Sequence, residues 1–160
     1  GEAYHMFIEA LRLYGNMNCR EHQKSGGDDP CGRLESDFGM ELLAALVEAS
    51  ITLKEDKKAE KFLERMRDEI IENRYYLMKY RQLNASLLAL RGEYTRAFGE
   101  LGVALKINPE NSSVLLQYAE LCEKVGNNDD AILYYNKLLV KGKRFDWVKG
   151  RIEKVKALKQ

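Results

Sequence analysis

Apolar residues recur at every third or fourth position along most of the chain, which is the spacing of one face of an α-helix. The pattern predicts eight helices separated by short polar segments. They cover residues 2–15, 37–53, 56–72, 74–91, 94–106, 111–125, 128–141 and 145–158. Only two prolines occur, Pro30 and Pro109, and the composition between them favours helix. An all-α chain is therefore expected.

Two segments of the chain repeat each other at a distance of 34 residues. Each consists of a predicted helix, a turn that contains glycine, and a second helix. The matched pairs are Ala85 with Ala119, Leu87 with Leu121, Gly92 with Gly126, Ala97 with Ala131, and Leu105 with Leu139. The glycines suit a left-handed backbone at a helix C-terminus, and the alanines suit a close approach of two helices.

This pattern resembles the tetratricopeptide repeat family. One copy is "YLMKYRQLNASLLALRGEYTRAFGELGVALKINP", which ends on Pro109 at the usual proline position of the family. Arg81 stands in this copy where the family usually has a large apolar residue. A more diverged copy begins at Met40 and leads the next by 38 residues, so we expect its second helix or the following turn to be about one helical turn longer.

The opening stretch resembles the second half of a repeat, because Ala3, Phe7 and Ala10 have the spacing of a second helix. The resemblance implies a right-handed α-solenoid of stacked antiparallel helix pairs in one domain, with about three and a half repeats and a C-terminal capping helix. We expect the chain to be part of a larger protein. The expected segments are a second helix at 1–15, a polar insertion at 16–37, repeats at 38–73, 74–109 and 110–143, and the cap at 144–160.

The resemblance also implies a function, which is protein–protein interaction within a larger multi-subunit assembly. In this family the first helices line a concave groove that receives a partner segment. The corresponding groove residues here are Glu41, Glu48, Lys79, Gln82, Ser86, Ser113, Leu116, Gln117 and Glu120. Family members that bind chaperone C-terminal tails use a clamp of Lys, Asn and Arg at such positions. Neither repeat frame offers paired amides and cations for a terminal carboxylate, so chaperone tails are disfavoured as partners.

Charge and hydropathy narrow the classes of partner. The chain has 26 Lys and Arg against 25 Asp and Glu, so its overall charge gives no reason to expect nucleic acid. A basic bias at the C-terminus leaves one alternative open, a phosphate- or nucleic-acid-binding surface on the last helix. No apolar run is long enough for a membrane span. Three irregularly spaced cysteines favour a reducing, cytoplasmic location.

Little in the sequence points to catalysis or to a cofactor. Cys19, His22 and Cys31 are three potential zinc ligands with unfamiliar spacing, and a loop with incidental thiols is the preferred interpretation. The glycine-rich stretch "SGGDDPCG" lacks the lysine and the flanking strand of a phosphate-binding loop. We therefore expect neither an enzyme nor a bound cofactor.

Overall fold

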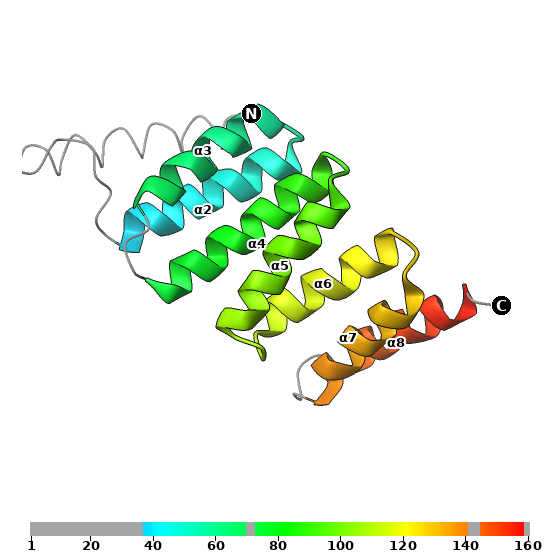
Figure 1. The fold of residues 1–160 in the computed structure, drawn as a ribbon. Coiled ribbons are helices and arrows are strands. Elements are labelled where there is room, and N and C mark those ends of the chain that lie inside the picture. The colour runs from blue at the N-terminus through cyan, green and yellow to red at the C-terminus, as the bar shows by residue number, and fades with distance from the viewer. Residues whose placement is uncertain (1–36, 70–72, 141–144, 159–160) are drawn as a thin grey trace, which may run out of the picture. The chain divides into compact units, whose positions relative to one another are not determined.

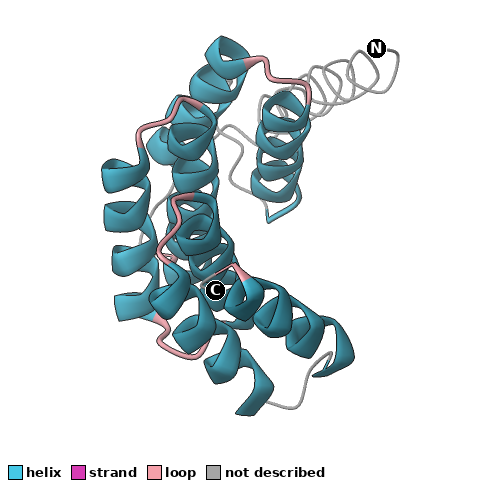
Figure 2. Ribbon diagram, turned by 90° about the vertical axis from the view of Figure 1, so that its right-hand side faces the viewer, coloured by secondary structure: helices cyan, strands magenta, loops and turns pink. Residues whose placement is uncertain are grey.

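The computed structural model describes residues 37–69, 73–140 and 145–158. This part of the chain contains seven α-helices and no strand (Figures 1 and 2). The helices are α2 (Asp37–Thr52), α3 (Asp56–Glu69), α4 (Arg74–Leu90), α5 (Tyr94–Ile107), α6 (Ser112–Lys124), α7 (Asn128–Val140) and α8 (Phe145–Ala157). Seven of the eight predicted helices are thus confirmed to within three residues. The predicted helix at 2–15, with Ala3, Phe7 and Ala10, lies outside the described residues, as does nearly all of the 16–37 insertion.

Four pairs of successive helices pack together. The chain forms two compact units, residues 1–83 and 84–160, and the boundary lies within α4. In the first unit α2 packs against α3. In the second unit α6 packs against both α5 and α7, and α7 packs against α8. None of the helices in the described ranges is both long and apolar enough to cross a membrane.

The core of the second unit is built from one apolar face of each of its last three helices. Tyr135 is the largest fully buried side chain of this core. Helix α8 contributes an apolar face formed by Val148, Ile152 and Val155. The buried cluster contains Leu115, Ala119, Cys122, Ala131, Tyr135, Leu138, Val148, Ile152 and Val155. The last helix therefore covers apolar surface of α6 and α7 that would otherwise meet water. The first unit also has buried apolar residues on both of its paired helices. They are Leu43, Leu46, Val47, Ala59, Leu63 and Met66.

The three helix pairs are joined by the same type of turn. Gly92 and Gly126 have φ values of 80° and 78°, and Lys54 has a φ of 58° at the corresponding position between α2 and α3. After each of these residues, the next backbone N–H donates to a carbonyl five residues earlier. The three bonds are Glu55 N to Ser50 O at 2.8 Å, Glu93 N to Leu88 O at 2.8 Å, and Asn127 N to Cys122 O at 2.9 Å. This bond is typical of a helix that ends on a left-handed residue.

The additional helical turn lies in α4, which corrects the expectation that it would extend the preceding second helix or the turn after it. The second helices α3 and α5 are both 14 residues long. The first helices differ, because α4 has 17 residues and α6 has 13. Asn73 Oδ1 accepts hydrogen bonds from the N–H groups of Tyr75 and Tyr76, just as Asn111 caps α6. The number of residues from the start of the helix to its turn glycine is thus four larger for α4 than for α6.

Two substitutions at the turn residues test whether the three turns share a left-handed backbone. Lys54→Gly should raise the free energy of unfolding by roughly 0.5 kcal/mol, because it relieves a left-handed non-glycine residue at the cost of a more flexible unfolded chain. Gly92→Ala should lower it by about 1 kcal/mol. A Cβ at Gly92 would meet no atom within 4 Å, so the loss would come from the backbone alone. Urea unfolding measures both changes, and a shift of both variants in the same direction would contradict the shared turn geometry.

Candidate partner-binding faces

The nine groove residues predicted from the sequence lie on the first helices α2, α4 and α6. None of them is buried. The first unit holds four of them, Glu41, Glu48, Lys79 and Gln82. The second unit holds the other five, Ser86, Ser113, Leu116, Gln117 and Glu120. Leu116 packs partly against the buried cluster of the second unit, so it combines a structural contact with a surface position.

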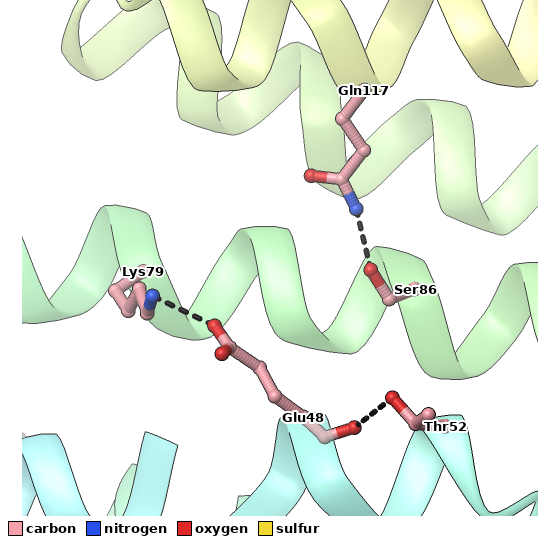
Figure 3. Close-up of polar contacts among 5 residues, drawn as sticks. All are labelled: Glu48, Thr52, Lys79, Ser86 and Gln117. Carbon is pink, nitrogen blue, oxygen red and sulfur yellow. Dashed lines mark hydrogen bonds and ion pairs between the residues drawn. The ribbon is translucent and has the colours of Figure 1, made fainter. Parts of the chain in front are cut away.

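Two polar contacts join neighbouring first helices at the same spacing. Lys79 Nζ lies 2.8 Å from Glu48 Oε1, which joins α4 to α2. Gln117 Nε2 donates to Ser86 Oγ over 2.6 Å, which joins α6 to α4. Figure 3 draws both contacts. In each case the partners are 31 residues apart, so both contacts join one first helix to the next at the same sequence spacing. The structure thus brings these predicted groove residues together in pairs.

The carboxyl of Glu120 lies within electrostatic reach of Arg151 in the second unit. Arg151 on α8 is 31 residues after Glu120 on α6, and its charge acts to lower the pKa of the Glu120 carboxyl. The net pKa of Glu120 is nevertheless raised, first because neighbouring protein atoms partly desolvate the carboxyl and then because Glu123 is close. Arg151 itself forms an ion pair with Glu123, with Nη2 to Oε2 at 2.8 Å.

Tyr75 extends the α2–α4 contact of the first unit by one helical turn. It lies in the additional turn of α4, and its side chain is 52% exposed. The pKa of its phenol is raised by partial burial, by the charge of Glu41 and by a hydrogen bond with Glu41. Tyr75 is not among the predicted groove residues, because these follow the 34-residue period of the family, in which Tyr75 corresponds to Pro109 outside the next first helix.

Four side chains form a connected group between α6, α7 and α8. Tyr135 Oη lies 3.0 Å from Glu123 Oε2, to which it donates, and the same carboxylate pairs with Arg151. The Trp147 ring meets the Tyr135 ring edge-on, with centroids 6.4 Å apart. The Arg151 guanidinium carbon lies 5.9 Å from the Trp147 ring centroid. Trp147 is still 47% exposed, so its ring is held in place and remains accessible.

These contacts weaken the case for a basic surface on the last helix. Arg151 is paired with Glu123, and Lys156 is paired with Glu153 at 2.9 Å. Lys143 and Arg144, which also contribute to the basic bias at the C-terminus, lie outside the described residues. Across the described ranges, no group of three His, Cys, Asp or Glu side chains could hold a metal ion. The possible ligands Cys19, His22 and Cys31 belong to the undescribed part of the chain.

Comparison with known proteins does not identify a family. No protein-family description matches the chain, and no curated protein is detectably similar to it in sequence.

The buried thiol and phenols predict how stability depends on pH. Burial raises the pKa of Cys122 to about 11 and, as the largest cause, the pKa of Tyr118 and Tyr135 to about 12. The unfolded chain loses these protons at lower pH, because the ordinary pKa values are 9.0 for the thiol and 10.0 for the phenols. The free energy of unfolding should therefore fall as pH rises from about 9 towards 12. Urea titrations between pH 8 and pH 11 would measure it.

Cys122→Ala is the matched variant for this test. It removes the thiol contribution, so its stability should fall less steeply than that of the unaltered chain between pH 9 and about 11. Equal slopes in the two proteins would mean that the thiol ionises as easily in the folded state as in the unfolded one.

Proposed function

We propose that this chain is a protein–protein interaction module of a larger multi-subunit assembly, and that its first helices bind a segment of a partner protein. The proposal includes the tetratricopeptide type of architecture, a right-handed solenoid of antiparallel helix pairs. The observation that carries it is the 31-residue spacing of Glu48 with Lys79 and of Ser86 with Gln117. Helices that meet repeatedly at one spacing present the same row of positions to a ligand.

This arrangement suits recognition of a chain segment better than recognition of a small molecule. Within each unit, side chains from two first helices lie next to each other, with the charged pair Glu48 and Lys79 in the first unit and the amide and hydroxyl groups of Gln117 and Ser86 in the second. A peptide that crosses such helices can contact several of them at once, and each contact adds a little specificity. The link from fold to function is by analogy, since one architecture serves many purposes. The proposal includes no catalytic step and no cofactor.

The polar pairs also bear on the kind of partner. A terminal carboxylate needs unengaged amides and cations, whereas Lys79 is paired with Glu48 and Gln117 is bonded to Ser86. Chaperone tails therefore stay disfavoured. On the alternative of a phosphate- or nucleic-acid-binding surface on α8, Arg151 is already paired with Glu123 and Lys156 with Glu153. Such binding would be steeply salt-dependent, and a flat response to salt would remove that alternative.

Added bulk on a first helix should block the partner. Ser113 is exposed on α6, so Ser113→Arg leaves the core intact while it obstructs the proposed face. We expect it to weaken binding of a partner captured by the full chain at least about tenfold, the equivalent of about 1.4 kcal/mol. Isothermal titration with the purified partner measures the affinity.

The control places the same side chain on a second helix. Asn136 is exposed on α7, and Asn136→Arg should leave the affinity within about twofold. If Asn136→Arg is the damaging variant and Ser113→Arg is silent, the partner binds the second helices and the proposal is wrong.

A further inference from the structure

Helix α7 has one buried face and an opposite face that is exposed along the whole helix. The buried face contributes to the core of the second unit. The residues of the opposite face are Asp129, Leu133, Asn136, Lys137 and Val140, and each of them is exposed. Two of these residues are large and apolar, since Leu133 is 49% exposed and Val140 is 89% exposed. The packing of the described helices therefore leaves an apolar surface of α7 in contact with water.

The exposed face carries a row of three residues at a spacing of four. The row consists of Asp129, Leu133 and Lys137, so an acid and a base lie at equal distances on either side of a leucine. Residues at this spacing form one of the ridges along which two helices most often pack. When two such rows lie antiparallel, Leu133 meets the partner's Leu133 and Asp129 meets the partner's Lys137. The row is therefore complementary in both charge and shape to a second copy of itself.

Both charged residues of the row can bond to a second copy while they keep their places on α7. Asp129 lies in the first turn of the helix, and an exposed carboxylate can accept several hydrogen bonds at once. Lys137 Nζ lies 4.5 Å from the centroid of the Tyr134 ring. This contact uses the charge of the ammonium and leaves its N–H groups able to donate to a carboxylate.

The symmetry of the row favours a second copy of the chain over an unrelated partner. Two copies related by a two-fold axis must present the same patch to each other, so each contact between different residues occurs twice. An acid and a base placed equally far from a central apolar residue satisfy this condition. One antiparallel contact would cover Leu133 and form two reciprocal ion pairs.

We propose that two copies of this chain associate through α7, with the two helices antiparallel and the two-fold axis at Leu133. The surface goes beyond the proposed function, because it uses a second helix whereas the partner segment binds first helices. A contact between two short helices covers a small area. We therefore expect a weak dimer with a dissociation constant of about 100 µM.

Sedimentation equilibrium of the 160-residue chain measures this association directly. Leu133→Gln keeps the size of the side chain and a good helix former, and it should weaken the dimer at least about tenfold. Leu53→Gln is the matched control, because Leu53 is exposed to nearly the same extent, at 51%. It lies next to the C-terminus of α2 in the first unit, and its substitution should leave the dissociation constant within about twofold.

Charge reversal tests the antiparallel arrangement itself. Asp129→Lys and Lys137→Glu should each weaken self-association, because each places two pairs of like charges across the two-fold axis. In a mixture of the two variants, every Asp129 meets a Lys137 and every new lysine meets a new glutamate. We therefore expect the mixture to associate about fivefold more tightly than either variant alone. A variant that had merely lost its fold would not be rescued by mixing.

The proposal is overturned if the chain remains a monomer up to about 1 mM, tenfold above the expected constant. It is also overturned if Leu53→Gln weakens the dimer as much as Leu133→Gln does, or if mixing the charge variants restores nothing. These outcomes are separate from failure of the proposed function, because Ser113→Arg on α6 changes partner binding and should leave self-association unaltered.

Discussion

The close packing of paired helices at a small residue is the constraint on which this structure depends. Ala59, Ala97 and Ala131 are each completely buried, and each lies five residues after the left-handed residue of its turn. The turn directs the second helix back along the first, and the alanine gives the two backbones room to approach. Larger side chains then fill the space on either side, as Leu63, Leu101 and Tyr135 do four residues later. In a helix pair of this kind, one face of the first helix is able to contact the next pair and another face is exposed to solvent.

The contacts between first helices add polar interactions to this packing. Pairs 31 residues apart fix which side chains meet across neighbouring helices, and they engage several of the groups that a carboxylate ligand would need. One turn before the second member of a pair, the chain places Tyr75, Ser113 and Trp147 at the surface. The residues that hold the helices together and these exposed residues are thus adjacent but distinct.

The turn glycines and the small residues at helix contacts made most of the fold predictable, because their 34-residue repeat is visible in the sequence itself. The start of α4 at residue 74 was predicted, but the additional helical turn was assigned to the preceding second helix or turn, since the segment between α3 and α4 contains no proline or glycine and the cap from the Asn73 side chain is not visible in the repeat. The pairing of Glu48 with Lys79 follows from the way neighbouring helices are staggered, which no repeat period specifies. Likewise, Ser50 is fully buried with no hydrogen-bond partner for its hydroxyl. Its polar side chain alone would have predicted a surface position.

Enlarging the three contact alanines tests the central claim, that one helix pair is repeated. Ala59→Leu, Ala97→Leu and Ala131→Leu keep a strong helix former and change only the volume at the contact. Each should lower the free energy of unfolding in urea by roughly 2 kcal/mol, because a tightly packed core has no room for three more carbons. The same change at the exposed Ala157 of α8 should be close to neutral. A neutral result at any of the three buried alanines would show that its helices do not meet as closely as the others, and would contradict the repeated pair.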